Sequence, residues 1–145
     1  YLKLEDPPTP TKISSIKSTI GDRLGIFGGL GGAVGAVARW GTLEILPFHT
    51  QWPWQILFIN VLGSAALGVL VGYSIRTSQR IFFLAASTGF CGAFTTFSAY
   101  TVDIALFIRA GQFFNGFSYL ITSTIGGLAA YKISKQLTEA KGQHG

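Results

Sequence analysis

Long stretches without a charged residue recur along most of the chain. Three of them, residues 54–75, 81–102 and 110–131, each run for about 22 positions. At 1.5 Å per residue, each stretch is long enough to cross the roughly 30 Å hydrocarbon core of a bilayer. We therefore predict three transmembrane helices, over residues 54–75, 81–108 and 110–131.

A fourth apolar segment comes first in the chain and is less uniform. Residues 24–38 are apolar and rich in glycine, and Arg39 follows them before Pro47. Because proline ends a helix at or before the preceding residue, we predict a first helix over residues 24–46, with Arg39 near its far end. Together the four helices predict a membrane domain over residues 24–133, which leaves no room for a soluble domain.

The two ends of the chain and the first connection are polar. Residues 1–23 contain several prolines and charges, and they predict a partly mobile head in which residues 12–20 form an interfacial helical turn. Residues 47–53 include two prolines and predict a loop. Residues 134–145 predict a polar tail.

Charge supports the membrane interpretation and suggests an orientation. Only 12% of the residues are charged, about half the usual ~25%, and the net charge is +5. The basic residues lie between and outside the apolar runs and form no stripe, so no nucleic-acid partner is expected. Arg39 and Arg109 lie on one predicted side of the membrane. On the other lie Lys3, Lys12, Lys17, Arg23, Arg76, Arg80, Lys132, Lys135 and Lys141. The positive-inside rule then predicts cytoplasmic termini and a multi-pass protein of the plasma (inner) membrane.

Polar side chains inside the predicted helices need partners in hydrocarbon. Asn60 is central in the second helix, and Ser64 follows one turn later on the same face. In the fourth helix, Tyr119 and Ser123 are spaced in the same way. These residues either make interhelical hydrogen bonds or form a column of hydrogen-bond donors. No nucleophile and base are paired, which argues against an enzyme.

The third helix has an unusual centre. Residues 89–100 combine two glycines with three hydroxyl residues and four aromatic residues. Glycines and the Thr95-Thr96 pair weaken a helix, and a break would expose carbonyl oxygens that suit a cation. Phe97 and Tyr100 share a face, where their ring edges would meet an anion. The alternative interpretation is a packed aromatic core with its hydroxyls bonded to their own helix. The single Cys91 excludes an intrachain disulfide and is interpreted as a small buried hydrophobe.

Three ordered motifs resemble the Fluc (CrcB) family of fluoride channels. They are GAVGAVARW at residues 32–40, NVLGS at 60–64 and GFCGAFTTFS at 89–98. The third motif is the most specific, and the resemblance covers about residues 25–131.

The resemblance implies an all-α integral membrane protein with four transmembrane helices, the third broken at its centre. It implies an antiparallel, dual-topology dimer with two narrow pores that passively export cytoplasmic fluoride and so protect against its toxicity. Arg39 would lie at a vestibule, and the carbonyls of Gly92 and Thr95 would hold a structural Na⁺ at the dimer interface. The implied pore residues are Asn60, Ser64, Thr96, Phe97, Ser98, Tyr100, Tyr119 and Ser123.

Two other classes of protein remain as alternatives. A small multidrug-type transporter needs an acidic residue within its first helix, and Glu44 lies too near the predicted helix end to serve well. A non-transporting membrane scaffold would explain the glycines and gives no reason for Asn60 together with the third motif. The charge bias also leaves the second subunit open, because an antiparallel homodimer usually has balanced basic residues. The partner is either a second copy or an oppositely oriented paralogue.

Overall fold

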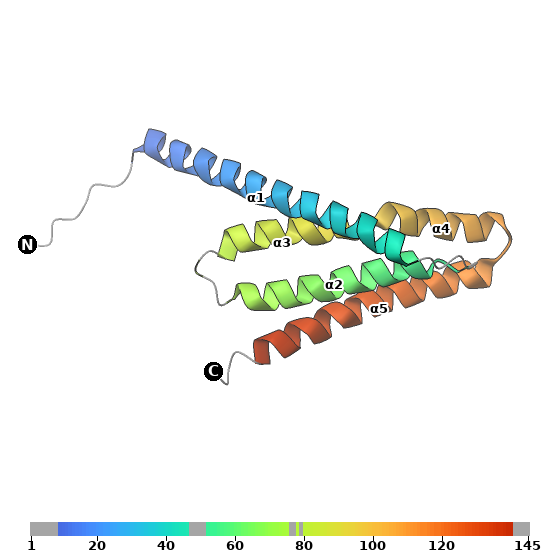
Figure 1. Ribbon diagram of the computed structural model, residues 1–145. Helices are drawn as coiled ribbons and strands as arrows, with labels where there is room; N and C mark the ends of the chain where they lie inside the picture. Colours follow the sequence, from blue (N-terminus) through green and yellow to red (C-terminus); the bar gives the residue numbers. More distant parts are fainter. Residues whose placement is uncertain (1–8, 47–51, 76–77, 79, 141–145) are drawn as a thin grey trace, which may run out of the picture.

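The computed structural model describes residues 9–46, 52–75, 78 and 80–140, apart from two side chains at positions 12 and 13. Its helices, shown in Figure 1, are α1 (Pro10–Ile45), α2 (Trp54–Ser74), α3 (Arg80–Phe94), α4 (Phe97–Arg109) and α5 (Phe113–Ala140). The predicted third helix is therefore two helices separated by Thr95 and Thr96, which confirms the expected break. Residues 47–51 of the predicted loop lie outside the described part.

Both terminal helices are longer than the sequence predicted. The predicted start of the first helix at residue 24 was wrong, because α1 begins at Pro10. A proline at the first helical position has no intrahelical bond to lose there and already has a helical φ. α5 also continues to Ala140, past the predicted helix end at residue 131, so the first part of the predicted polar tail is helical. Charge-free length indicates how much of a helix can lie in hydrocarbon, whereas helical hydrogen bonds continue through polar sequence.

A tight turn joins α4 to α5. Gly111 has a φ of +72°, in the left-handed region that glycine adopts without steric cost. Its amide donates to the Ile108 carbonyl, and the amide of Gln112 donates to the Phe107 carbonyl at 2.8 Å. This Schellman arrangement satisfies the last carbonyls of α4. It also delays the start of α5 to Phe113, three residues after the predicted start at residue 110.

The first close helix pair is α1 with α3, and glycine permits its approach. A side chain on Gly31 would collide with the carbonyl of Ala86, and one on Gly35 would collide with the carbonyl of Phe90. On the other helix, Gly89 meets the backbone of Gly28 in the same way. Small residues at such seams allow backbones to approach closely inside a bilayer.

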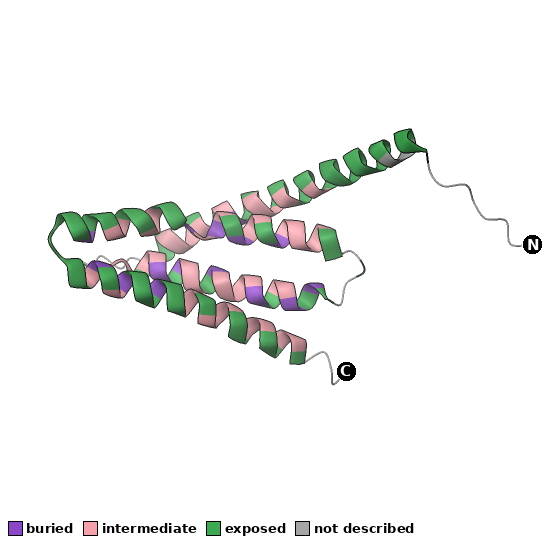
Figure 2. Cartoon of the chain, turned by 180° about the vertical axis from the view of Figure 1, so that it is seen from behind, coloured by how far each residue is buried: buried purple, intermediate pink, exposed green. Residues whose placement is uncertain are grey.

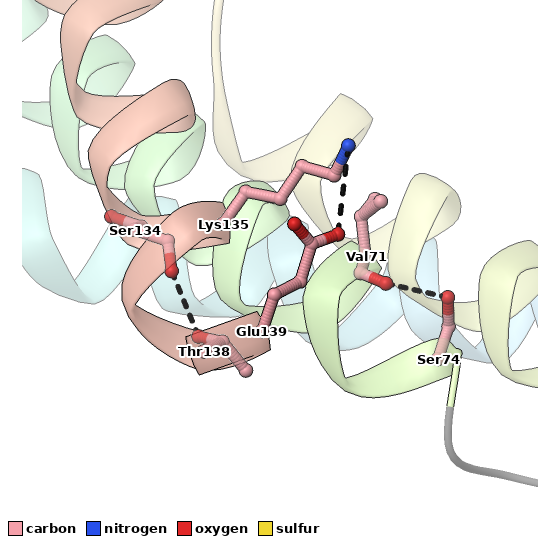
Figure 3. Close-up of polar contacts among 6 residues, drawn as sticks. All are labelled: Val71, Ser74, Ser134, Lys135, Thr138 and Glu139. Atoms are coloured by element: carbon pink, nitrogen blue, oxygen red, sulfur yellow. Dashed lines mark hydrogen bonds and ion pairs between the residues drawn. The ribbon is translucent and has the colours of Figure 1, made fainter. Parts of the chain in front are cut away.

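The second close pair is α2 with α5, which run parallel to each other. Gly68 of α2 packs on the backbone of Tyr131, and Gly72 packs on Lys135 and Thr138. At this end of the pair, the Thr138 hydroxyl donates to the Ser134 carbonyl at 2.8 Å, and Lys135 pairs with Glu139 at 3.7 Å (Figure 3). Figure 3 also shows Ser74 donating to the Val71 carbonyl. Each of these three polar contacts lies within one helix, and Gly68 and Gly72 bring the two backbones close to each other.

Apolar side chains cover the outside of the chain. Exposed residues form long faces on every helix (Figure 2), and Leu30, Val34 and Val37 of α1 are each more than 60% exposed. Within the described residues, α2 and the continuous span Arg80–Arg109 are long and apolar enough to cross a membrane. Only 28% and 22% of these two windows are buried, whereas a core helix of a soluble protein would be mostly buried. The apolar surface therefore suits lipid.

Candidate functional site

The break between α3 and α4 is built by Thr96. Its backbone is extended, with φ −140° and ψ 107°, and its side-chain oxygen accepts a hydrogen bond from the amide of Ala99 at 3.2 Å. Threonine favours this N-cap position because the side-chain oxygen satisfies an amide that has no partner within the helix. The Ser98 hydroxyl lies 3.3 Å from the same Thr96 oxygen. α3 therefore ends at Phe94, and Thr96 caps the start of α4.

Asn60 of α2 holds the break from the side. Its Oδ1 accepts from the amide of Thr96 at 2.9 Å, and its Nδ2 donates to the carbonyl of the same residue at 3.2 Å. One amide side chain thus replaces both the donor and the acceptor that a helical neighbour would supply. An asparagine amide has two N–H donors, so one donor of Asn60 is not used by Thr96.

Two carbonyls at the break are released from helical hydrogen bonds. The Thr96 amide would bond the Gly92 carbonyl in a continuous helix, and here it donates to Asn60 instead. The Ala99 amide likewise donates to the Thr96 side chain and not to the Thr95 carbonyl. The Thr95 carbonyl accepts a hydrogen bond from the Arg39 guanidinium at 3.3 Å.

The space beside Gly92 is open. Gly92 is exposed, and a side chain at its position would meet no atom within 4 Å. Gly92 and Thr95 also line a cavity of about 220 Å³ between α2 and α3. The described residues contain no cluster of three acidic, histidine or cysteine side chains that would hold a metal. A cation at this site would therefore rest on carbonyl oxygens. Arg39 uses one lone pair of the Thr95 carbonyl, so the second lone pair can still act as an oxygen ligand.

Aromatic rings connect α4 to α5 beside the break. The ring centroids of Phe97 and Tyr100 are 5.8 Å apart, and those of Tyr100 and Tyr119 are 5.5 Å apart. Tyr119 is fully buried, and Trp52 meets it edge to face at 5.3 Å. Phe97 is 77% exposed, so its ring lies open on the surface of the single chain.

The two tyrosine hydroxyls have different partners. The Tyr119 hydroxyl donates to the Asp103 carboxylate at 3.5 Å, and the Tyr100 hydroxyl donates to the Leu120 carbonyl at 3.4 Å. Asp103 was not among the predicted site residues. Its signal was available, because it is the only acidic residue between Glu44 and Glu139, and an acidic residue in a membrane span is a functional candidate by default.

The buried hydroxyl of Ser123 makes no hydrogen bond of normal geometry among the described residues, although it interacts with the Tyr119 hydroxyl one turn earlier. The contacts between α2 and α5 show which residue of α2 lies beside Ser123. Ser64 touches Gly127, and Gly68 touches Tyr131. Both pairs have an offset of 63 positions (127 − 64 and 131 − 68), which places Ser123 at the level of Asn60. Ser64 differs from Ser123, because its hydroxyl donates to the Asn60 carbonyl one turn earlier at 2.8 Å.

The predicted residues therefore form two adjoining groups. The break group surrounds the interrupted helix, and it consists of Arg39, Asn60, Ser64, Gly92, Thr95, Thr96 and Ser98. The aromatic group joins α4 to α5 through Phe97, Tyr100 and Tyr119. Ser123 lies one turn beyond Tyr119 on α5. Sequence reasoning missed Trp52 and Phe107 as neighbours of Tyr119, because contacts between distant rings leave no periodic signal.

These features define a class of small α-helical membrane protein with a capped break in one helix and a line of polar groups beside it. The family model described as "CrcB-like protein, Camphor Resistance (CrcB)" matches residues 26–134 of the chain. The chain belongs to this CrcB family.

Curated relatives support the same membership. A protein of Chlorobium phaeobacteroides named fluoride-specific ion channel FluC is 37% identical over 114 residues, which cover 77% of this chain and 89% of the relative. A Haemophilus ducreyi protein of the same name is 34% identical, over 68% of this chain and 78% of the relative. The Streptococcus pneumoniae protein named fluoride-specific ion channel FluC 2 is 38% identical, over 72% and 85% respectively.

Proposed function

We propose that this chain is one subunit of a passive, fluoride-selective ion channel and not an enzyme. The relatives that carry the name fluoride-specific ion channel support this assignment. The observation that carries it is the buried hydroxyl of Ser123, which lacks a well-formed hydrogen bond and lies at the level of Asn60. A buried hydroxyl without a well-formed hydrogen bond in a membrane domain is costly, which favours a ligand at this position.

The chemistry of fluoride fits these side chains. Fluoride is small and strongly hydrated, so a pore has to replace its water with N–H and O–H donors. The second N–H of Asn60 and the Ser123 hydroxyl are donors of this kind, and ring edges of Phe97, Tyr100 and Tyr119 add weaker contacts. Weak contacts also allow release, which conduction requires. In this proposal fluoride leaves the cytoplasm down its gradient across the plasma (inner) membrane.

A second subunit completes each pore in the proposal. Phe97 is 77% exposed and Ser98 is exposed in the single chain, so both are open to another protein surface. We propose an antiparallel dimer with two pores, in which the break group faces the partner and Arg39 lies at a vestibule. A structural Na⁺ bound by the Gly92 and Thr95 carbonyls would neutralise the partial negative charge that the break exposes.

Fluoride efflux from liposomes tests the function. Purified protein in vesicles loaded with fluoride or chloride should release fluoride far faster than chloride, as measured with ion-selective electrodes. Ser123→Ala should slow fluoride release at least tenfold without loss of stability. Ser118→Ala is the matched control, because the Ser118 hydroxyl donates to the Asn115 carbonyl within its own helix. Equal fluoride rates for both variants would remove Ser123 from the pore, and silence of the parent protein would favour a scaffold.

Terminal labelling tests the subunit arrangement. The basic residues favour cytoplasmic termini for every copy, whereas an antiparallel homodimer needs both orientations. A tag on the C-terminus that is labelled from both sides of the membrane in intact cells supports the homodimer. One-sided labelling indicates an oppositely oriented paralogue as the partner.

A further inference from the structure

An open groove lies between α1, α2 and α3, beside the first turns of α3. It has a volume of about 480 Å³, and Leu70 of α2 forms one of its sides. The α1 and α3 sides consist of Phe27, Leu30, Val34, Phe83, Ala86 and Phe90. We call this space the side groove. The channel proposal does not use it.

The packing of α2 on α3 explains why the side groove exists. Near the break, Gly63 lets α2 approach the side chains of Phe94 and Thr95 closely. Toward the start of α3, two large rings meet instead, since the centroids of Tyr73 and Phe83 lie 6.1 Å apart. α2 and α3 therefore spread apart toward this end (Figure 1), which leaves the groove between them and α1.

The side groove suits a hydrocarbon chain and not water. Among the described residues that line it, only Ser87 has a polar side chain, and its hydroxyl donates to the Phe83 carbonyl at 2.7 Å. A buried water needs two to four polar partners, which this lining does not offer. Leu30 and Val34 are each 61% exposed, so they continue the groove onto the apolar surface that suits lipid.

The side groove lies on the opposite side of α3 from the break group. Gly92 follows Phe83 by nine positions and Phe90 by two. At 100° per residue, Gly92 is about 180° from Phe83 and about 160° from Phe90 around the helix. In the dimer proposed above, the break group faces the partner. The groove then faces away from the partner and toward lipid.

One arginine lies on each wall at the same end of the groove. Arg23 precedes Phe27 by four positions and Leu30 by seven, and Arg80 precedes Phe83 by three. These helical spacings place each arginine on the groove side of its own helix. Both are exposed, and neither forms an ion pair within the part of the chain that the structure describes.

The glycine seam aligns the two arginines. Gly31 lies against Ala86 and Gly35 against Phe90, so α1 and α3 run parallel with an offset of 55 positions (86 − 31 and 90 − 35). The arginine of α1 is therefore level with position 78, within about 3 Å of the arginine of α3 along the helix axis. Because the seam keeps the backbones close, both long side chains can reach one phosphate group.

We infer that the side groove binds an acyl chain of an anionic phospholipid whose phosphate is held by Arg23 and Arg80. A guanidinium group matches a phosphate through two parallel hydrogen bonds, and the two unpaired positive charges complement a lipid with net negative charge. The relative position of the arginines and the groove is set within the protein, so this site is present in detergent as well as in a bilayer.

Native mass spectrometry of the full-length protein in a non-ionic detergent tests this inference independently of fluoride conduction. One phosphatidylglycerol per chain should bind at least tenfold more tightly than phosphatidylcholine with the same acyl chains. Soluble glycerol phosphate should not displace the lipid, because it has no chain to fill the groove. Equal affinity for the two lipids would overturn the inference. Displacement by glycerol phosphate would do so as well, and would indicate a site for free phosphate.

Charge removal tests the phosphate contacts. Arg23→Gln and Arg80→Gln should each weaken phosphatidylglycerol binding about fivefold, since each base contributes a similar free energy near an anionic group. The double variant should bind both lipids alike. Arg109→Gln, an equal charge change at the other end of the molecule, should bind phosphatidylglycerol as the parent does. If Arg109→Gln matched the two single variants, net charge and not this site would account for the preference.

A polar substitution in the groove tests the position of the chain. Val34→Asn should weaken the binding of both lipids about fivefold, because the chain loses an apolar wall. Ile125→Asn of α5 is the matched control, because Ile125 is also 61% exposed and lies outside the groove. Parental binding by Val34→Asn would overturn the inference. Loss of the dimer mass in Val34→Asn alone would do the same and would identify a second copy as the occupant.

Discussion

The two close helix pairs differ in what lies between their helices. Along α1 and α3, Gly31 and Gly35 bring one backbone against the other. The pair α2 and α5 also has glycine contacts, and on α2 it carries Asn60 opposite the break. α5 adds Tyr119 and Ser123. The first pair is thus a glycine seam that adds Arg39 to the break, and the second pair carries Asn60, Tyr119 and Ser123 of the candidate pore.

This difference explains how a helix break persists in a membrane. An unsatisfied backbone group in hydrocarbon costs several kcal/mol, so a break needs support from its surroundings. The glycine seam fixes the position of α3, and Asn60 then reaches Thr96 with both of its polar atoms. The α1–α3 pair holds the backbone in position, and the α2–α5 pair carries the polar side chains. Substitutions in the two pairs should therefore have different effects.

The largest effect is expected at the glycine seam. In Gly31→Val, the new side chain would collide with the Ala86 carbonyl, and backbone atoms cannot move aside cheaply. We expect a loss of about 3 kcal/mol of stability, seen as a strongly lowered thermal midpoint in detergent. Gly29→Val is the matched control, because a side chain at Gly29 meets no atom within 4 Å and the change in helix propensity is the same. Equal midpoints for the two variants would show that the seam is not tight.

Asn60→Ala should affect both stability and conduction. The variant loses two hydrogen bonds to Thr96, each of about 0.6–2 kcal/mol in a membrane protein, so we expect a loss of about 1–4 kcal/mol. Fluoride efflux should fall below detection, because both the break and a donor are lost. Ser64→Ala, whose hydroxyl bonds within its own helix, should change the thermal midpoint little. An Asn60→Ala protein with parental stability would mean that Asn60 does not brace the break.

The sequence predicted the break and its principal residues because their signals are local. Glycine and threonine weaken a helix wherever they occur, so the interruption near Gly92 and Thr95 was visible from composition alone. The contacts of the break were not visible. Asn60 meets Thr96 across 36 positions, and Arg39 meets Thr95 across 56. Such pairs depend on the relative register of two helices, which the pattern of one helix does not determine.

Helix ends were predicted less well than helix centres for a related reason. The start of α1 at Pro10 lies in polar sequence, where nothing in the apolar pattern marks a boundary. The connection after α4 was predicted between residues 108 and 110, whereas Gly111 sets its geometry. Asp103 was overlooked although an acidic residue in a span is itself a signal, and its contact with Tyr119 was not visible because Tyr119 comes from another helix.

A smaller effect is expected at the cap of α4. Thr96→Ala removes the oxygen that accepts from the Ala99 amide and should cost about 0.5–2 kcal/mol. Thr96→Ser keeps an acceptor and should recover most of this loss. Thr101→Ala is a suitable control, because the Thr101 hydroxyl only donates back to Ser98 within α4. Chemical denaturation in detergent would measure all three variants. Similar losses for Thr96→Ala and Thr101→Ala would contradict the capping role.

The smallest effect is expected for Tyr100→Phe. This variant tests whether the Tyr100 hydroxyl, on α4, belongs to the candidate pore. The Tyr100 hydroxyl donates to Leu120 at 3.4 Å, a long bond to a carbonyl already within a helix. Its loss should therefore change stability by less than about 1 kcal/mol. The ring remains in contact with Phe97 and Tyr119, so fluoride efflux should be altered in rate and not abolished. Efflux with fluoride and chloride electrodes would measure both rate and selectivity. Parental values for both would place the Tyr100 hydroxyl outside the pore and leave Ser123 and Asn60 as its donors.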